Sequence, residues 1–94
     1  MEGGPSLPNR DPVEDARALK DLVEQMARAL VDNPDQVTVE SAEEDVALVL
    51  RLRVAPSDVG RVIGKQGRTA KAMRTVIHAI AARSKRRAVL EILE

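Results

Sequence analysis

The chain is 94 residues long, 44% of its residues are apolar and 32% are charged, and its net charge is zero. This length and composition allow one domain with a single modest core. Cys, Phe, Trp and Tyr do not occur. Their absence excludes a disulfide framework, a thiolate metal site, a cysteine nucleophile and modules that stack bases on aromatic side chains, such as the RRM and most OB-folds.

The charges are divided between the two halves of the chain. Residues 1–50 carry four Lys or Arg and twelve Asp or Glu, a balance of −8, whereas residues 51–94 carry eleven and three, a balance of +8. From Arg61 to Arg87 there are nine basic residues and no acidic one. Such a one-signed stretch favours a polyanionic partner, with an ordinary solvated helical face as the alternative.

Neither a membrane span nor a secretory signal is apparent. No apolar run approaches the ~20 residues that a membrane-spanning helix needs. The first residues, MEGGP, have neither the basic region nor the apolar region of a signal peptide. We therefore expect a cytoplasmic protein.

The N-terminal part of the chain predicts a tail and then a helix. Residues 1–10 contain two Gly, two Pro, Ser and Asn, a composition typical of a disordered tail. We assign residues 11–94 to a single domain. Asp11, followed by Pro, is a candidate helix cap. Apolar residues then recur every three or four positions up to Val31, which predicts a helix that ends at the Asp-Asn-Pro that follows.

Two strands are expected next. The alternation around Val37 and Val39 predicts a strand over residues 36–41, and residues 42–45 are a polar turn. Residues 46–54 predict a second strand, and a hairpin is the simplest link between the two. The apolar side chains on one face of this second strand are Val46, Leu48, Leu50, Leu52 and Val54.

The second half of the chain predicts two helices and a last strand. The segment Pro56-Ser57-Asp58 is a helix-start signal, and residues 59–63 fit a short helix that Gly64 stops. Residues 68–84 predict a long helix and, after a basic turn, residues 88–93 predict a strand. The predicted order is helix–strand–strand–helix–helix–strand, an α+β domain with a three-stranded sheet and its helices on one face. The apolar stripe of the long helix contains Ala70, Met73, Ile77, Ile80 and Ala81.

A glycine-rich loop joins the two predicted helices. Three of the five glycines lie at positions 60, 64 and 67, and glycine adopts backbone angles closed to other residues and lets another backbone come close. The amides and the dipole at the start of the following helix attract phosphate. Side chains in the loop, beside it and along one side of the long helix add positive charge. They are Arg61, Lys65, Arg68, Lys71, Arg74 and His78.

The loop and its surroundings resemble a known family. The segment from Ser57 to Thr69, SDVGRVIGKQGRT, is similar to the small bacterial single-KH-domain family called KhpA, or YlqC. Its core, VIGKQG at residues 62–67, matches the apolar pair and the G-x-x-G loop of KH domains, which clamps about four nucleotides by their backbone. The element order is that of the type II, or prokaryotic, KH domain, and the resemblance covers about residues 12–94. A bare G-x-x-G is weak evidence, whereas its combination with flanking helices, basic bias and element order is specific.

The resemblance implies non-catalytic binding of single-stranded RNA by an RNA chaperone or post-transcriptional regulator, and it leaves single-stranded DNA open as a ligand. It also implies a homodimer, a complex with the larger KH-containing protein KhpB, or both. No cofactor or metal is expected. The site residues expected to hold the nucleic-acid backbone are Gly64, Lys65, Gln66 and Gly67. Those expected to assist, or to extend the basic surface, are Arg61, Arg68, Lys71 and Arg74. Val59 and Val62 are assigned to the wall of a groove for bases, with burial in the core as the alternative.

Two other functions compete with this interpretation. A helix-turn-helix protein that binds duplex DNA also joins two helices through a Gly-containing turn, although here the first helix is very short. A protein-interaction module, acting mainly through a KH-containing partner, is the second. Its candidate dimer seam is an apolar strip of Ala72, Val76 and Ala79 on the long helix, for which ordinary packing under the sheet or the first helix is the alternative.

Enzymatic chemistry is not expected. The segment GRVIGKQ has three residues between its glycines, and Gln66 follows the Lys. A P-loop needs four residues there and Ser or Thr after the Lys. The single histidine, His78, has no Ser, Cys or paired carboxylate that the sequence places beside it.

Overall fold

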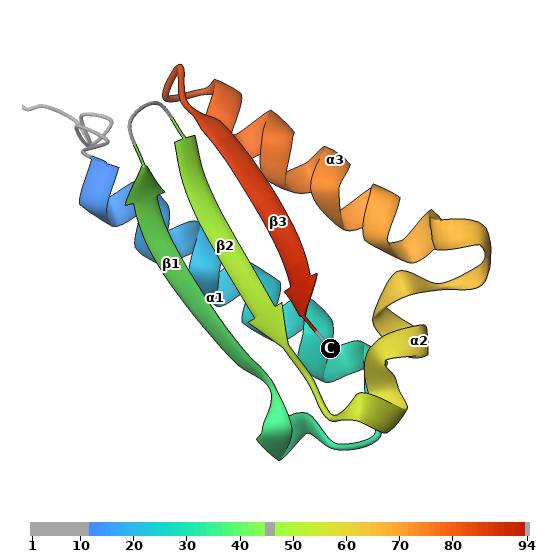
Figure 1. Cartoon of the computed structure of the whole chain (residues 1–94). Helices are drawn as coiled ribbons and strands as arrows, with labels where there is room; N and C mark the ends of the chain where they lie inside the picture. The colour runs from blue at the N-terminus through green and yellow to red at the C-terminus, as the bar shows by residue number, and fades with distance from the viewer. Residues whose placement is uncertain (1–11, 45–46, 94) are drawn as a thin grey trace, which may run out of the picture.

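Three strands and three helices form two layers in the computed structural model, which describes residues 12–44 and 47–93 (Figure 1). The sheet has the order β1-β2-β3, in which β2 pairs antiparallel with β1 and parallel with β3. The predicted element order and the α+β class are confirmed. The elements are α1 (Pro12–Leu30), β1 (Thr38–Glu44), β2 (Ala47–Arg53), α2 (Val59–Ile63), α3 (Arg68–Ala82) and β3 (Arg87–Leu93).

An aliphatic core lies between the sheet and the helices. Because side chains alternate across a strand, Leu48, Leu50 and Leu52 share one face of β2, and all three are almost fully buried. Leu19 and Val23 of α1 and Ile77 of α3 pack against them in the same core cluster. Burial of each such side chain stabilises the fold by about 1.5–3 kcal/mol. Val62 of α2 belongs to the same cluster, so all three α-helices lie on one face of the sheet, as predicted.

Strand β1 begins two residues later and ends three residues later than the predicted strand at residues 36–41. Residues 42–44, expected to form a polar turn, continue the strand, and Glu44 pairs with Ala47 of β2. The backbone ladder satisfies the amides of this segment, so exposed polar side chains do not end the strand. Asp45 and Val46, which the prediction placed in the turn and on the core face, lie outside the described residues, as do the predicted tail at residues 1–10 and the cap Asp11.

Smaller differences occur around α3. The helix ends at Ala82, two residues before the predicted end, and β3 begins one residue early, at Arg87. The intervening turn contains Lys85 with a positive φ of 57°, and its Arg86 amide donates to the Ala81 carbonyl at 3.1 Å. The turn is therefore tied back to the last turn of the helix.

The buried carboxylate of Asp58 connects α2 to the end of α1. Its side chain is 1% exposed, and it accepts hydrogen bonds from the Asp32 amide (3.2 Å), the Asn33 amide (3.1 Å) and the Asn33 side chain (3.0 Å). Although Asp58 directly precedes α2, as its helix-start role predicted, its side chain makes no capping hydrogen bond to that helix. The carboxylate instead holds two segments that are 25 residues apart.

Among the described residues, no helix combines the length and the apolarity needed to cross a bilayer.

Candidate nucleic-acid interface

The loop at residues 64–67 has a left-handed backbone that directs it away from the rest of the domain (Figure 1). Gly64 has φ 78° and ψ 171°, Gln66 has φ 56° and ψ 25°, and Gly67 has φ 74° and ψ 13°. The Gly67 amide donates to the Gly64 carbonyl at 3.0 Å, and the Arg68 amide donates to the Lys65 carbonyl. These two bonds make the loop a tight turn that leads directly into α3.

Only glycine fits at position 64. A Cβ on Gly64 would overlap the side chain of Thr69 and would come within 2.8 Å of the Thr69 amide nitrogen. Its φ and ψ also lie in a region that side chains essentially do not enter. At Gly67, by contrast, a Cβ would meet no atom within 4 Å, so only the positive φ opposes a side chain there.

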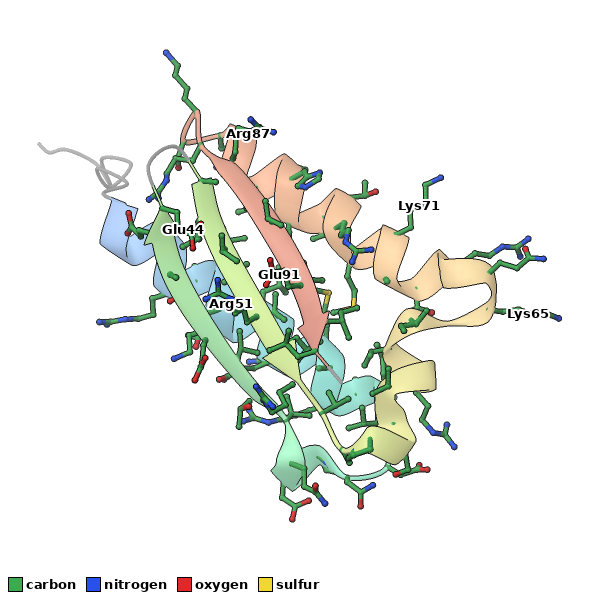
Figure 2. The ribbon with its side chains drawn as sticks, viewed as in Figure 1. Glu44, Arg51, Lys65, Lys71, Arg87 and Glu91 are labelled. Carbon is green, nitrogen blue, oxygen red and sulfur yellow. The ribbon has the colours of Figure 1, made fainter. Side chains whose placement is uncertain are left out.

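The side chains at the tip of the loop are available to a ligand. Lys65 and Gln66 are both exposed, and Figure 2 shows Lys65 extending from the loop into solvent. Arg68, also exposed, is the first residue of α3, a helix of 15 residues. Because the N-terminal end of a helix carries a partial positive charge, the start of α3 and the side chains of Lys65 and Arg68 form one anion-attracting surface.

Arg61, which the sequence also predicted for this surface, is engaged elsewhere. Its guanidinium lies 3.0 Å from a carboxylate oxygen of Asp32 and 3.9 Å from one of Asp58. The side chain is more than half exposed, so the Asp32 pair contributes about 1 kcal/mol at most. Arg61 therefore reinforces the junction between α1 and α2, and a phosphate would have to compete with two carboxylates for it.

The pKa of Asp58 is shifted by its surroundings. Burial by itself raises the pKa of this carboxyl group. The hydrogen bonds from the Asn33 side chain and from the Asp32 and Asn33 amides outweigh that effect, and Arg61 adds to them, so the net pKa is lower than usual. The carboxylate of Asp58 is thus held in its charged form directly before α2, the helix that leads into the loop.

The basic side of α3 divides into free and engaged residues. Lys71 is exposed and points away from the sheet (Figure 2). One turn further on, Arg74 donates from Nε to the Leu90 carbonyl of β3 at 3.4 Å. His78, another turn on, is exposed and shares a groove with Arg74. Arg74 therefore bridges α3 and β3, whereas the sequence had predicted it only as a surface cation.

The apolar wall beside the loop is made by one helix face. Val62 is fully buried in the core. This supports the alternative role in the core, and Val62 is not part of the wall of a groove for bases. Val59 is half-buried and packs in part against the core cluster, and Ile63, one turn along α2, is 37% exposed. Residues four apart share a helix face, so Val59 and Ile63 form the apolar strip next to the loop. Adjacent residues of a helix point in different directions. The pair Val62-Ile63 could therefore have identified Ile63 as the exposed member.

The predicted seam on α3 is exposed. Val76 is 41% exposed, and Ala72 and Ala79 are also exposed, so the alternative that these residues pack under the sheet or the first helix is wrong. Ala72 and Val76 line a shallow apolar groove of about 320 Å³ between α1 and α3, and Ala79 does not. The other residues of this groove are Met26, Ala29, Leu30, Thr69 and Met73.

The open face of the sheet has mixed charge. Arg51 of the central strand lies 3.5 Å from Glu44 of β1 and 3.2 Å from Glu91 of β3, and Figure 2 shows the three side chains grouped across the strands. One arginine and two glutamates sum to a charge of −1, so this group is not part of a basic surface. The unbalanced positive charge therefore lies on the loop, along α3 and at its end.

Comparison with known proteins agrees with this architecture. The family described as KhpA/KhpB, KH domain, matches residues 20–92. A protein of Aquifex aeolicus named RNA-binding protein KhpA is 53% identical over 77 residues, which cover 82% of this chain and 98% of that protein. Proteins of the same name from Clostridium acetobutylicum and Listeria monocytogenes are 51% and 41% identical, and the matches cover 80% and 81% of this chain and the whole of each relative.

A solved structure shares the fold at low sequence identity. The crystal structure of Aquifex aeolicus Era bound to GDP and aluminium fluoride superposes with a TM-score of 0.57 and 21% identity. The match covers 98% of this chain but only 35% of that one, so the likeness concerns the fold alone. The helix pair that a helix-turn-helix would need is part of the KH domain that the family match covers. Because the family match covers residues 20–92 and relatives of that family are 41–53% identical over nearly their whole length, the chain belongs to the KhpA/KhpB family of KH domains.

Proposed function

We propose that this protein binds single-stranded RNA without catalysis, and that the loop at residues 64–67 grips the RNA backbone. The observation that carries the proposal is the conformation of this loop, in which two left-handed glycines place exposed Lys65 and Gln66 at the start of α3. A G-x-x-G loop of this kind clamps the backbone of about four nucleotides. Val59 and Ile63 provide aliphatic contact surface for bases, consistent with a chain that has no aromatic residue.

A double substitution at the loop tip tests this function. We expect Lys65→Asp/Gln66→Asp to weaken binding of single-stranded RNA by at least about tenfold, because it places two negative charges where phosphate would lie. Asp is tolerated in the left-handed conformation of Gln66, so the fold should remain intact. The measurement is fluorescence anisotropy with labelled single-stranded RNA, single-stranded DNA and duplex DNA, with circular dichroism as the check on folding.

The matched control makes the same two changes of charge on α1. Arg17→Asp/Gln25→Asp alters two exposed residues away from the loop and changes the net charge equally, so it should reduce affinity much less. Equal losses in the two variants would mean that overall charge, and not the loop, determines binding. A preference for duplex DNA in the unaltered protein would contradict the proposal as a whole.

The proposed cellular role is that of an RNA chaperone or post-transcriptional regulator in the cytoplasm. The name RNA-binding protein KhpA, which the relatives share, supports the RNA binding on which this role depends. A contact with only about four nucleotides provides limited affinity. We therefore propose that the protein acts as a homodimer or together with KhpB, since two linked sites bind RNA more tightly than one.

The apolar groove between α1 and α3 is the surface we propose for self-association. It is lined by Ala72, Val76 and five further residues, nearly all of them apolar. We expect Val76→Lys to convert a dimer to a monomer in sedimentation experiments at high concentration, because the substitution inserts a charge into an apolar contact. Val76 is 41% exposed, so the monomer should remain folded. A dimer that persists in Val76→Lys, or an unaltered protein that is monomeric at high concentration, would contradict this surface.

A further inference from the structure

The single cation of α2 is held by a carboxylate from another segment of the chain. Arg61 lies within α2, about one helical turn before Lys65 in the loop. Its guanidinium is 3.0 Å from a carboxylate oxygen of Asp32, in the segment that follows α1. Among the residues that the structure describes, Lys65 and Arg68 form no such ion pair. The three cations closest to the loop in sequence therefore differ, because two are available to a ligand and one is engaged.

The pair between Arg61 and Asp32 can open without stranding a buried charge. The two side chains are 56% and 68% exposed, so water solvates each of them once they separate. The backbone at Asp32 is fixed independently of this pair, because the Asp32 amide donates to the buried carboxylate of Asp58 at 3.2 Å. Opening of the pair therefore requires only that side chains rotate, while the junction between α1 and α2 stays in place.

Asp58 keeps its hydrogen bonds when Arg61 leaves. Its buried carboxylate accepts three of them, from the Asp32 amide, the Asn33 amide and the Asn33 side chain. The Arg61 guanidinium is 3.9 Å from this carboxylate, which is beyond hydrogen-bond distance. Of the two carboxylates near Arg61, only Asp32 is therefore in direct contact and has to be displaced.

We propose that Asp32 competes with RNA for Arg61, and that the pair holds this arginine away from a phosphate next to those gripped by the loop. The inference rests on the proposed function, because it concerns the affinity of the same site. A guanidinium binds carboxylate and phosphate oxygens in similar geometry, so an RNA strand that reaches α2 takes the place of the Asp32 carboxylate. Asp32 is thus a positioning residue that acts through Arg61. It keeps the affinity for RNA below the value that the cations around the loop could provide.

The test measures the affinity for a labelled oligouridylate of eight nucleotides by fluorescence anisotropy. Asp32→Asn removes the carboxylate and keeps the backbone amide that donates to Asp58. Its matched control is Asp35→Asn, which makes the same change of charge at an exposed position three residues further on. Both substitutions are repeated in an Arg61→Gln background, so that an effect transmitted through the arginine is separated from the general effect of removing a negative charge. Circular dichroism checks that each variant is folded.

Asp32→Asn should bind the oligomer about two- to fivefold more tightly than the unaltered protein, the range that an exposed ion pair supports. Asp35→Asn should gain much less. Because Arg61 then contacts a phosphate, the salt dependence of Asp32→Asn should be steeper by ~0.7. In the Arg61→Gln background the two asparagine variants should bind alike. Equal gains in the two variants, or a gain of Asp32→Asn that persists in Arg61→Gln, would overturn the inference.

Two further variants separate the remaining outcomes. Asp32→Ser also lacks the carboxylate and should bind as tightly as Asp32→Asn. Weaker binding by both, with the fold intact, would mean that Asp32 supports the site and does not compete for it. The loop variant Lys65→Asp/Gln66→Asp tests the other proposal: undiminished binding contradicts the loop clamp, whereas only the comparison of Asp32→Asn with Asp35→Asn decides the role of Asp32.

Discussion

Gly64→Ala is expected to destabilise the folded domain by about 2–4 kcal/mol. Alanine at this position would have to adopt a strained backbone conformation, and its Cβ would have to displace Thr69. The Cβ would come within 2.8 Å of the Thr69 amide nitrogen, which is part of α3 and cannot rotate away. Since small domains are stable by only ~5–15 kcal/mol, this is a large share of the total. The measurement is urea denaturation followed by circular dichroism.

Two neighbouring glycines provide the controls. Gly67→Ala should cost only about 1–2 kcal/mol, since its positive φ is the sole obstacle. Gly60→Ala should stabilise the protein by about 0.5–1 kcal/mol, because Gly60 lies within α2 and a Cβ there meets nothing within 4 Å. Equal costs at positions 64 and 67 would show that the close approach to Thr69 does not matter.

Asp58→Asn is expected to lower the midpoint of thermal unfolding at neutral pH by roughly 5–10 °C. The carboxylate accepts hydrogen bonds from the Asp32 and Asn33 amides and from the Asn33 side chain. An asparagine keeps one acceptor oxygen, but its NH₂ group would face these donors and leave at least one of them without a partner. Asp35→Asn, at an exposed position near the same junction, is the control and should change the midpoint little.

The stabilisation that Asp58 provides depends on pH, and the direction of this dependence follows from its pKa. The pKa of Asp58 is lowered in the folded protein, so the unfolded chain takes up this proton at a higher pH than the folded one. The stabilisation is therefore fully present above the unfolded value of about 3.9 and is lost as the pH falls through the folded value. The difference in midpoint between the unaltered protein and Asp58→Asn should shrink as the pH falls below about 4. A constant difference from neutral to acidic pH would mean that the charge of Asp58 does not contribute.

Local patterns predicted most of the elements because the forces that form them are local. The spacing of Leu19, Val23 and Ala27 identified α1, and the alternation of Leu48, Leu50 and Leu52 identified β2, since each follows from the geometry of its own element. The end of β1 was wrong because its last residues are held by pairing with β2, and strand pairing outweighs the turn preference of polar side chains.

The roles of individual polar side chains were harder to predict because their partners are distant in sequence. Arg74 contacts a carbonyl 16 residues away, and Asp58 contacts residues 25 and 26 positions earlier. Periodicity carries no information about such contacts. The glycines of the loop were identifiable because their backbone angles are local properties, whereas the groove beside β3 exists only once the strand has packed next to α3.

The parallel pairing of β2 and β3 has a consequence for how the protein folds. β1 and β2 are neighbours in sequence and join through a short connection, whereas Val49 of β2 pairs with Val89 of β3, and α2, the loop and α3 lie between them. Closing so long a connection is entropically costly and slow. We therefore expect the hairpin of β1 and β2 to form before β3 pairs with β2. Docking of β3 should accordingly be the late, rate-limiting event of folding.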